Sequence, residues 1–515
     1  MAKLDTNMNR IVVIPTAGTG SRMGHLTASL NKALLPYQCK SVISHIINQF
    51  PVTTNFIVPV GYLADQVMDF CSIAHADRNI VFVKVDDYLS DKSGPSYTLR
   101  QCRDKISGPF WYVPCDTYFN EEVVDRVTDS NCYFVKKVAE KDSYLYTMFE
   151  VDSSHRITKL IFKQLSAHTN TAFTGLMYIQ EYEKFFESLE EINSPELIYS
   201  IQLGETVVNL NSWQDFGNPI NYQTELNKSQ KFDFTKKDEL TYICNTKVVK
   251  WWADGSIPKK KYTKTLLNPS VFPSSCQHLG NFMAYDYFDG KTLYESNNPE
   301  IFTSYLNWLK DEVWFTVDAD ISVASIEFYK NKTIARVNKF LEKYPTLNQI
   351  NVIDGIKVND YSYYLNNIDW DYLITITAPG FIHGDLHFDN TIVNNEGEFK
   401  VIDWRHEFAN IVEFGDIYYD LAKLAGGFII NYAKIKEHNF RIEIDNDNVT
   451  LSIPSIDQAS VYQKQLKEFI ISQGYDYKKV QMLIPIIYWN MSPLHAAPFD
   501  LFLWYLGIKL FQELA

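Results

Sequence analysis

Two His, two Asp and an Asn stand close together in FIHGDLHFDN, which runs from Phe381 to Asn390. Asp385 follows a tight His383–Gly384 turn, Asn390 comes five residues later, and the strand-like run EFKVIDW then leads to Asp403. Kinases transfer a phosphoryl group with an Asp that accepts the hydroxyl proton, and with an Asn and a second Asp that hold Mg²⁺. Two acid-rich turns beside a hairpin are the alternative, but the ordered set favours a catalytic loop over residues 383–403.

A second sequence suited to phosphate lies near the start of the chain, in TAGTGSRMG at Thr16–Gly24. Its glycines let the backbone turn sharply and approach a phosphate without obstruction by a Cβ atom. Arg22 and Lys32 supply two cations for a triphosphate. A plain glycine turn with two surface cations is the alternative, but ligands of open α/β sheets bind where this loop stands, after the first strand. The predicted nucleotide contacts in the loop are Ala17, Gly18, Thr19, Gly20 and Ser21.

Two carboxylates are candidates to complete this first site. Asp116 ends the strand-like run FWYVPCD, and Asp215 lies in the turn sequence WQDFGNP. Mg²⁺ on a nucleotide takes one or two carboxylates together with phosphate oxygens. Asp116 alone is equally typical of a helix N-cap, but the glycine loop upstream favours the metal interpretation.

The elements that must position these residues follow from periodicity. Apolar strand-like runs alternate with amphipathic helical segments in the first part of the chain, which predicts crossover units and an α/β fold with a doubly wound, Rossmann-like mixed sheet. The predicted strands are Ile11–Ala17, Asn55–Gly61, Asn79–Val85 and Phe110–Asp116, and the predicted helices are Lys40–Phe50 and Tyr62–Ser72.

The strand–helix alternation fades after Trp213–Tyr222, and a polar stretch follows at Asn227–Glu239. A short β-like run and then mostly helical sequence come after it, as in a bilobal, protein-kinase-like α+β domain. We therefore expect a first domain over residues 1–228, a linker over 229–240, a small lobe over 241–290 and a large lobe over 291–515.

Composition narrows the class of protein. The chain has 515 residues and a formal net charge of −14, which argues against a nucleic acid as the main partner. The seven cysteines form no C-x-x-C pair, so we expect a reducing cytoplasm and no structural zinc. No signal peptide or apolar run of membrane-spanning length is found. The expected partners are a small-molecule acceptor and nucleotides, and the oligomeric state stays open.

Residues Ile11–Tyr222 resemble the nucleotidyltransferases that join a nucleoside triphosphate to a sugar phosphate or a phosphocholine-like compound. The family's opening motif, A-G-x-G-x-R-[ML] followed by P-K-x-L, is matched by Ala17, Gly18, Gly20, Arg22, Met23, Lys32 and Leu34, with Asn31 in place of the proline. The resemblance implies catalytic roles for Arg22 and Lys32.

Further motifs of this family follow in the same order. SGPSYTL is similar to the loop that holds base and ribose, which implies nucleotide contacts by Gly94 and Ser96. ITKLIFK followed by TAFTGLMYI implies that Lys163 lies near the acceptor phosphate, although the family glutamate before it is Phe162 here. WQDFGNPINY implies that Asp116 and Asp215 bind Mg²⁺.

HGDLHFDN followed by VIDW resembles the aminoglycoside phosphotransferase and choline kinase group. The resemblance implies that Asp385 is the catalytic base, that Asn390 and Asp403 hold Mg²⁺, and that His383 braces the loop. GDIYYDLAKL is similar to the helix that follows in this group, and we expect Asp416 and Asp420 to support the loop rather than take part in the chemistry.

Other parts of a kinase are less complete. TKVVKWW predicts a small-lobe strand whose Lys250, or alternatively Lys247, holds the ATP phosphates, and FMAYDYFDGKTL resembles the hinge, with Tyr285 near adenine. No glycine-rich loop precedes the lysine strand, and no glutamate lies between Lys250 and the hinge. His495 is a candidate acceptor contact, although a core or capping histidine is the commoner case.

The two chemistries are consecutive, because a kinase makes a phosphomonoester and a nucleotidyltransferase consumes one. We therefore expect a bifunctional enzyme that uses ATP, then CTP or another nucleoside triphosphate, with Mg²⁺ at both sites. Its overall match is to phosphocholine-type cytidylyltransferases and to bacterial capsule-cluster proteins, which by analogy makes a surface-polysaccharide precursor the expected product.

Several alternatives stay open. They are a sugar kinase with a uridylyl- or guanylyltransferase, a choline or ethanolamine pathway, and a single-activity enzyme whose other domain only binds or regulates. Aminoglycoside resistance is a weaker alternative function, because it would leave the first domain unexplained.

Overall fold

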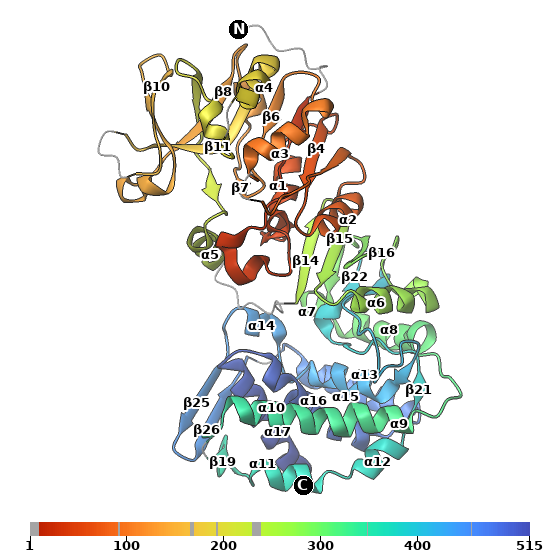
Figure 1. Ribbon diagram of the computed structural model, residues 1–515. Coiled ribbons are helices and arrows are strands. Elements are labelled where there is room, and N and C mark those ends of the chain that lie inside the picture. The colour runs from red at the N-terminus through yellow and green to blue at the C-terminus, as the bar shows by residue number, and fades with distance from the viewer. Residues whose placement is uncertain are drawn as a thin grey trace. The chain divides into compact units, whose positions relative to one another are not determined.

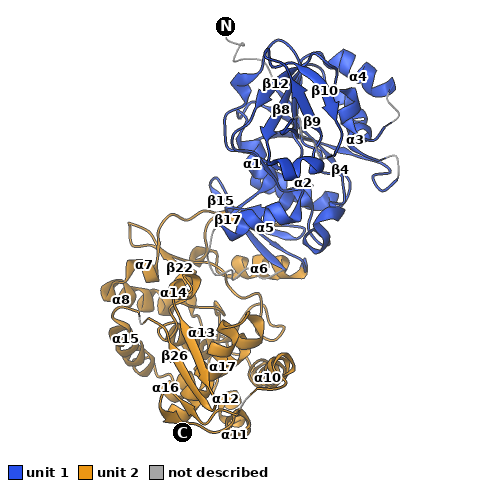
Figure 2. Cartoon of the chain, turned by 90° about the vertical axis from the view of Figure 1, so that its left-hand side faces the viewer, with its two compact units in different colours: residues 1–230, 238–255, 279–284 blue, residues 231–237, 256–278, 285–515 orange. Residues whose placement is uncertain are grey.

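The computed structural model describes residues 10–90, 93–164, 169–191, 194–228, 238–347, 349–454 and 456–515. The chain forms two compact units (Figure 2). Unit 1 comprises residues 1–230, 238–255 and 279–284, and unit 2 comprises residues 231–237, 256–278 and 285–515. Most of the linker expected at 229–240 lies outside the described residues, and the predicted domain boundaries stay predictions.

A nine-stranded mixed sheet forms the centre of unit 1 (Figure 1). Its strands are β1 (Ile11–Val13), β4 (Asn55–Val60), β5 (Asn79–Lys84), β6 (Phe110–Tyr112), β8 (Cys132–Lys137), β9 (Met148–Val151), β10 (Ile157–Ile161), β11 (Thr171–Ile179) and β12 (Thr206–Asn209). The order is β10-β9-β11-β6-β1-β4-β5, with β8 paired to β11 and β12 paired to β8. β1 runs parallel to β4 and β6, whereas β11 runs antiparallel to β6. The predicted mixed, doubly wound sheet is confirmed.

Helices cover both faces of this sheet. They are α1 (Val42–Asn48), α2 (Ala64–Ala74), α3 (Pro95–Gln101), α4 (Tyr182–Glu191) and α5 (Pro219–Asn227). Val12 packs in one core cluster with residues of α1 and α2, whereas Ile11 and Val13 pack in another with residues of α3 and α4. Successive strand side chains point to opposite faces, so a continuous apolar run is what a sheet covered on both sides requires.

Two predicted strands end earlier than the sequence indicated. β1 stops at Val13 and β6 at Tyr112, although both runs were expected to continue for four more residues. Pro15 and Pro114 follow closely, and a proline has no N–H to donate to a neighbouring strand. The candidate residues after these strands therefore stand on loops at the carboxyl edge of the sheet.

The strands expected for a kinase small lobe share the core of unit 1. β14 (Glu239–Cys244) pairs with β15 (Lys247–Trp252), and Asn281, before β17 (Phe282–Asp286), donates to the carbonyl of Trp252 at 2.7 Å. The Tyr242 hydroxyl donates to the carbonyl of Leu34 at 2.7 Å. The ring of Phe70 on α2 lies 5.1 Å from that of Tyr242. These strands therefore belong to the hydrophobic core that also supports the glycine loop.

The short strands of unit 1 outside the large sheet pair locally. β2 (Pro36–Tyr37) pairs with β3 (Lys40–Ser41), and β7 (Thr117–Tyr118) pairs with β13 (Gln214–Asp215). The second pairing matters for the site, because it holds Asp215 beside the residues that follow Asp116.

Unit 2 is mostly helical. Its helices are α6 (Ser256–Leu267), α7 (Leu293–Ser296), α8 (Pro299–Trp308), α9 (Ser322–Ser325), α10 (Lys332–Lys343), α11 (Tyr361–Asn367), α12 (Trp370–Thr375), α13 (Ile417–Gly426), α14 (Tyr432–Lys436), α15 (Ala459–Ser472), α16 (Tyr477–Met491) and α17 (Phe499–Leu514). Within the described ranges, no helix has both the length and the apolar character needed to span a membrane.

Short strand pairs interrupt these helices. The strands are β16 (Gln277–Leu279), β18 (Lys291–Thr292), β19 (Val352–Ile353), β20 (Ile356–Lys357), β21 (Pro379–Gly380), β22 (Thr391–Val393), β23 (Phe399–Val401), β24 (Gly415–Asp416), β25 (Arg441–Asp445) and β26 (Asn448–Ser452). β21 pairs with β24, and β22 forms a hairpin with β23. The first part of the predicted catalytic loop, His383–Asn390, lies between β21 and β22, so a paired strand stands near each of its ends.

Candidate functional site

The glycine loop of unit 1 follows β1 in the predicted position. Gly20 has a φ of 66°, a left-handed conformation that favours glycine. A Cβ atom there would lie 3.2 Å from Cγ2 of Thr27 and 3.3 Å from Cβ of Lys32, so the turn is also tightly packed. Gly18 and Ser21 are exposed, Thr19 is half-buried, and the carbonyl of the buried Ala17 accepts a hydrogen bond from the Tyr62 N–H at 2.9 Å.

Asn31, which stands where the resembled family has a proline, is a positioning residue. Its amide nitrogen donates to the carbonyls of Thr16 at 3.1 Å and Tyr62 at 2.7 Å, and its amide oxygen accepts from the Ala33 N–H at 3.0 Å. The side chain is buried, so these bonds are shielded from water. Asn31 therefore fixes the place of the neighbouring Lys32 relative to the glycine loop.

Asp116, Asp215 and Lys32 converge on one point beside Gly217. A Cβ atom on Gly217 would lie 2.5 Å from Oδ2 of Asp116, 2.9 Å from Oδ1 of Asp215 and 3.0 Å from Nζ of Lys32. Lys32 and Asp116 form an ion pair, and the Gly217 N–H donates to Asp215 Oδ1 at 2.8 Å. The structure thus brings together three predicted site residues that lie far apart in sequence.

The charges of this group act on one another. Burial disfavours the charged amine of Lys32, but the nearby carboxylates, Asp116 above all, outweigh it and raise the pKa of Lys32. Burial and the charge of Asp116 both raise the pKa of Asp215. The Gly217 N–H and the charge of Lys32 act in the opposite direction and favour the ionised form of Asp215.

This arrangement fits a divalent cation. Two carboxylates, with phosphate oxygens added by a nucleotide, form a set of oxygen ligands that Mg²⁺ accepts. The missing side chain of Gly217 leaves room between them. Within the described residues there is no group of three or more His, Cys, Asp or Glu suited to a metal, so any metal here depends on ligand oxygens as well.

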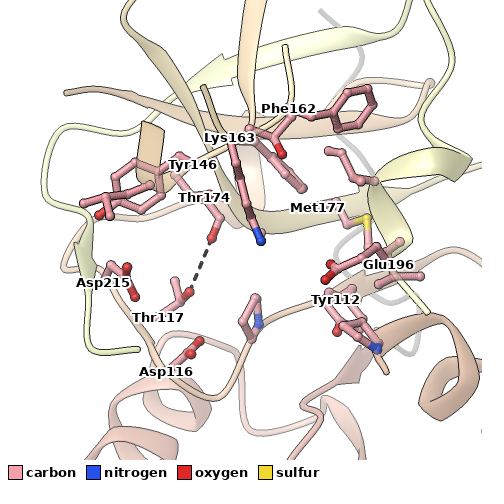
Figure 3. Close-up of a pocket in the computed structure, with 18 of the residues that line it drawn as sticks. Tyr112, Asp116, Thr117, Tyr146, Phe162, Lys163, Thr174, Met177, Glu196 and Asp215 are labelled. Carbon is pink, nitrogen blue, oxygen red and sulfur yellow. Dashed lines mark hydrogen bonds between the residues drawn. The ribbon is translucent and has the colours of Figure 1, made fainter. Parts of the chain in front are cut away.

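A cavity of about 350 Å³ opens next to these carboxylates (Figure 3). The Lys163 amine points into it, with Asp116 and Asp215 on one side and Glu196 on the other. Arg22 also lines it, so four of the predicted site residues face a single space. Aromatic rings form part of its walls, and these rings are Tyr112, Tyr146, Phe162, Phe173, Tyr199 and Trp213.

Two lining residues, Glu196 and Tyr146, were missed by the sequence reasoning. Glu196 adds a carboxylate opposite the metal candidates, and the Tyr146 hydroxyl hydrogen-bonds with Asp215, which together with burial raises the pKa of Tyr146. Neither residue belongs to a motif with a recognisable spacing, so only the folded chain could reveal them.

The predicted base-binding loop is held by Pro195. The Ser96 N–H donates to the Pro195 carbonyl at 2.9 Å, and a Cβ atom on Gly94 would lie 2.6 Å from that carbonyl oxygen. The backbone can approach this closely only because Gly94 has no side chain. The Ser96 hydroxyl is buried and has no hydrogen-bond partner within the described residues.

In unit 2, His383 ties the predicted catalytic loop to the strand that carries Asp403. Its Nδ1 accepts a hydrogen bond from the Asp385 N–H at 3.1 Å, and its Nε2 lies 2.7 Å from the carbonyl of Ile402. Burial lowers the pKa of His383 to about 3 despite the nearby charge of Asp385. The ring is therefore neutral, with a proton on Nε2 that is donated to Ile402.

Asp420 holds the same loop from α13. Its carboxylate accepts from the N–H groups of His383 at 2.7 Å and Gly384 at 2.6 Å, and from the indole of Trp314 at 3.1 Å. Burial raises the pKa of Asp420, so these three donors are what favours its charged form.

Asp416 lies one turn earlier and is bound by a different set of groups. Its carboxylate contacts Nζ of Lys479 at 2.7 Å, the Tyr329 hydroxyl at 2.9 Å and the Ala378 N–H at 3.0 Å. Asp416 thus joins α13 to β21 and α16 around the loop, although it does not touch the loop itself in these bonds.

The predicted metal residues of unit 2 lie at the open end of the β22–β23 hairpin. Thr391 pairs with Val401, and the Ile402 N–H donates to the Asn390 carbonyl at 2.9 Å. Asp403 has a φ of 59°, unusual for a residue with a side chain. The amide nitrogen of Asn390 donates to the carbonyl of Asp385 at 2.8 Å. An amide oxygen and a carboxylate at neighbouring positions suit Mg²⁺ bound to a nucleotide.

Asp385 forms an ion pair that the sequence did not predict. Its Oδ1 lies 2.7 Å from Nζ of Lys423, whose side chain is 8% exposed, while the Asp385 side chain is 42% exposed. Burial acts to raise the pKa of Asp385, but Lys423 first and His387 second outweigh it and hold the pKa well below its usual range. The same pairing raises the pKa of Lys423. Asp385 is therefore ionised and open to a ligand.

Lysines of α6 hold the segment that follows Asp403. The amine of Lys261 donates to the carbonyl of Trp404, and that of Lys264 donates to the carbonyl of Arg405 at 3.1 Å. Burial lowers the pKa of Lys264 to about 8. The helix α6, which follows the lysine strand β15, thus contributes lysines that contact the segment after Asp403. The glutamate expected between Lys250 and the hinge is absent from this part of the sequence.

The remaining candidates of the kinase prediction lie as follows. Lys250 is buried in β15, which belongs to unit 1. Tyr285 is buried in unit 2, with its ring 5.9 Å from that of Trp404. His495 contacts Phe499 with its ring at 5.1 Å, and its carbonyl accepts from Lys343 at 3.1 Å. The nucleotide and acceptor roles of these three residues stay predictions.

Residues 370–443 match the phosphotransferase enzyme family APH. The matched segment contains the loop from His383 to Asp403 together with Asp416 and Asp420. The C-terminal region therefore holds an APH phosphotransferase domain, and the predicted kinase-like fold class is confirmed.

Curated relatives match over less than half of the chain. The bifunctional protein GlmU of Methanococcus aeolicus is 24% identical over 245 residues, which cover 44% of this chain and 56% of the relative. GlmU of Methanococcus vannielii is 23% identical over 225 residues, which cover 40% of this chain and 52% of the relative. The chain thus spans about half the length of the curated relatives it matches.

Two solved structures are also similar. A candidate glucose-1-phosphate thymidylyltransferase from Bacillus anthracis is 18% identical and covers 44% of this chain and 98% of its own, with a TM-score of 0.38. A UDP-glucose pyrophosphorylase complexed with UDP-glucose is 15% identical, and the match covers 43% of this chain and 99% of that protein, also with a TM-score of 0.38.

Together, the comparisons show similarity to phosphotransferases in the C-terminal region and to sugar nucleotidyltransferases in the N-terminal region. This agrees with the class of enzyme that the sequence predicted.

Proposed function

We propose that this chain performs two consecutive reactions on one small molecule. The C-terminal domain phosphorylates a hydroxyl of the acceptor with ATP, and the N-terminal domain couples the new phosphate to a nucleotidyl group and releases pyrophosphate. CTP is the first donor to test. The activated product would serve as a precursor of a bacterial surface polysaccharide, and the free thiols of all seven cysteines agree with a reducing cytoplasm.

The observation that carries the first activity is the convergence of Asp116, Asp215 and Lys32 beside Gly217, at the edge of the cavity that Lys163 enters. Lys163 would hold the acceptor phosphate, one of whose oxygens attacks the α-phosphorus of the nucleotide. The bond between the α-phosphorus and its bridging oxygen then breaks, and pyrophosphate leaves. Lys32 and Arg22 would offset the charge that builds on the leaving group, and Mg²⁺ held by the two carboxylates would add to this.

In the second site, Asp385 accepts the hydroxyl proton of the acceptor. The hydroxyl oxygen bonds to the γ-phosphorus, and ADP leaves. Asn390 and Asp403 would hold Mg²⁺ on the ATP phosphates, with Lys250 and Tyr285 proposed as further ATP contacts. His383, Asp416 and Asp420 would keep the loop in place without touching the reacting atoms.

A pair of variants tests the proposal. Asp116→Ala should make the phosphorylated acceptor accumulate, since its kinase domain is intact. Asp385→Ala should produce no ADP, yet should still release pyrophosphate when it receives the phosphorylated acceptor. The readout is product analysis by mass spectrometry with ATP, each of the four common nucleoside triphosphates and a panel of polyols, amino alcohols, hydroxy acids and sugars.

Two outcomes would contradict the proposal. If Asp385→Ala converts the unphosphorylated acceptor as fast as the unaltered protein does, Asp385 is not the base. If Asp116→Ala releases pyrophosphate at the normal rate, the first site lies elsewhere. An enzyme with one inactive domain would form ADP or pyrophosphate, but never both.

A further inference from the structure

Four cationic side chains gather beside the predicted catalytic base of unit 2. Lys332 and Arg336 lie one turn apart on α10 and therefore share a face of that helix. Arg405 follows the predicted metal residue Asp403 by two positions. Lys423 reaches from α13 to the carboxylate of Asp385 at 2.7 Å.

One aromatic ring shows how close two of these cations are. Nζ of Lys332 lies 3.2 Å from the ring centroid of Phe328, and Cζ of Arg405 lies 4.9 Å from the same centroid. The ring of Tyr419 meets that of Phe328 edge-on at 4.8 Å, and Lys332 Nζ lies 5.6 Å from it. Phe328 thus contacts both cations, and Tyr419 contacts Lys332, without supplying a negative charge to neutralise them.

Arg405 places this cluster at the catalytic loop. Its N–H donates to the His383 carbonyl at 2.9 Å, and its side chain packs so closely that a Cβ atom on Gly384 would lie 2.6 Å from Cβ of Arg405. Gly384 directly precedes Asp385. The backbone and Cβ of Arg405 thus lie against the residue that precedes the predicted base, and Lys423 contacts the base itself.

The positive charge of the cluster is largely uncompensated. Among the described residues, no carboxylate lies within 4.0 Å of a charged nitrogen of Lys332, Arg336 or Arg405, and Asp385 pairs with Lys423 alone. Burial lowers the pKa of Lys332 well below its usual value, and Arg405, Arg336 and Lys423 lower it further. Cations that repel one another in a partly buried place are costly unless an anion joins them.

We propose that Lys332, Arg336 and Arg405 bind an anionic group of the kinase acceptor, a carboxylate or a phosphate, while Asp385 receives the proton of a hydroxyl on the same molecule. This inference rests on the proposed kinase function and narrows its substrate class to hydroxy acids or hydroxylated phosphate esters. It disfavours choline, ethanolamine and aminoglycosides, because their cationic groups would be repelled by the cluster.

Matched acceptors test the substrate class with the full-length protein and Mg-ATP. One set is glycerol, glycerate and glycerol 3-phosphate, a second is glucose, gluconate and glucose 6-phosphate, and a third is choline, ethanolamine and serine. We expect phosphorylation, followed as ADP and as product mass, only of compounds that carry a carboxylate or phosphate. The acid and the ester within a set distinguish the two anions. Faster phosphorylation of a neutral or cationic member than of its anionic partner would overturn the inference and leave the kinase proposal intact.

Variants test the residues. Lys332→Met and Arg336→Gln should each raise KM for the anionic acceptor by about 10–100-fold, the loss expected for one charge-assisted hydrogen bond. KM for ATP should stay unchanged, which separates an acceptor site from a second ATP-phosphate site. Lys464→Met removes an equal charge from a side chain that is 77% exposed on α15, and it should change neither constant. An unchanged KM for the acceptor in both cluster variants would contradict the assignment.

If no compound in the panel is phosphorylated, that result counts against the kinase proposal. A chemical probe tests the anion site independently of phosphorylation. Pyridoxal 5′-phosphate condenses with a neutral lysine amine to an imine and water, and borohydride then reduces the imine to a stable secondary amine. We expect peptide mapping to find Lys332 labelled by pyridoxal phosphate far more than by phosphate-free pyridoxal, and protected by inorganic phosphate. Equal labelling by both reagents would refute the anion site.

Discussion

The two predicted sites place the same residue type in opposite electrostatic settings. In unit 1, Asp215 faces a second carboxylate, and burial together with Asp116 raises its pKa. In unit 2, Asp385 faces cations, and Lys423 holds its pKa well below the usual range despite burial. A carboxylate in the first setting gains from a metal ion, whereas one in the second stays ionised without one.

This electrostatic difference suggests different roles for Asp215 and Asp385, which the sequence alone does not distinguish. Asp215 lies in a turn sequence and Asp385 follows a turn, and each belongs to a recognisable motif. In the first site two carboxylates lie close together beside Lys32, whereas in the second site the carboxylate of Asp385 pairs with a lysine near further cations. This is why we propose a metal-assisted nucleotidyl transfer in unit 1 and base-assisted phosphorylation of an anionic acceptor in unit 2.

The largest expected effect comes from a methyl group in the catalytic loop. Gly384→Ala places a Cβ atom 2.6 Å from Cβ of Arg405, at a residue whose φ is +84°. Displacing Asp385 by even about 1 Å should lower the rate of ADP formation by about 10²-fold or more. Pyrophosphate release from the phosphorylated acceptor should not change.

Gly397→Ala is the matched control for Gly384→Ala. Gly397 has a φ of +82° but no heavy atom near the added Cβ, so it carries the same backbone strain without the clash. Equal losses of kinase activity in the two variants would show that strain, and not the packing of Arg405, controls the loop.

The corresponding change in unit 1 is Gly217→Ala. The added Cβ would lie 2.5 Å from Asp116 Oδ2 and 2.9 Å from Asp215 Oδ1, so the carboxylates must separate. Pyrophosphate release should fall by about 10²-fold, with ADP formation unchanged. Gly108→Ala, which meets no atom within 4 Å, should have no effect. Loss of both activities in Gly217→Ala would mean that the two sites are not independent.

Asp420→Asn should have a smaller effect that is confined to unit 2. An amide has only one acceptor oxygen for the N–H groups of His383 and Gly384, so one buried donor loses its partner. We expect a loss of stability of about 1–3 kcal/mol, measured as a lower urea midpoint, and faster hydrogen exchange of peptides covering residues 381–390. Asp371→Asn, at an exposed position, is the control. Unaltered exchange in the loop would contradict the bracing role of Asp420.

The smallest expected effect is a shift in pH dependence. Lys423→Met removes the cation that lowers the pKa of Asp385, so that pKa rises. Because the base must be ionised, the acid limb of the kinase pH–rate profile should move to higher pH, measured as kcat at saturating acceptor. Lys310→Met, at an exposed lysine that pairs with Asp311 at 3.2 Å, should leave the limb in place. A limb that moves to lower pH would show that Lys423 does not act through Asp385.

Much of the fold could be predicted because strand and helix periodicities are local. The alternation of apolar runs with amphipathic segments predicted the mixed sheet of unit 1, and the predicted strand ends were several residues too long where Pro15 and Pro114 remove a donor. The loops that carry Arg22, Asp116 and Asp385 follow directly from their place after these runs.

The neighbours of those residues were not predictable, because they come from segments far apart in the chain. Lys423 is 38 residues from Asp385, and Glu196 and Tyr146 reach the first cavity from separate loops. No spacing rule connects such pairs. The same holds for β14 and β15. Their apolar pattern predicts strands, but it does not tell which hydrophobic core those strands join.

The sequence by itself therefore determined which groups are available for chemistry: carboxylates, an amide, lysines and glycines in an order that suits two phosphoryl transfers. Only the tertiary structure decided what surrounds each of them. The reason is physical: the charge state of a carboxylate depends on desolvation and on charges within a few ångströms, and folding alone sets those distances.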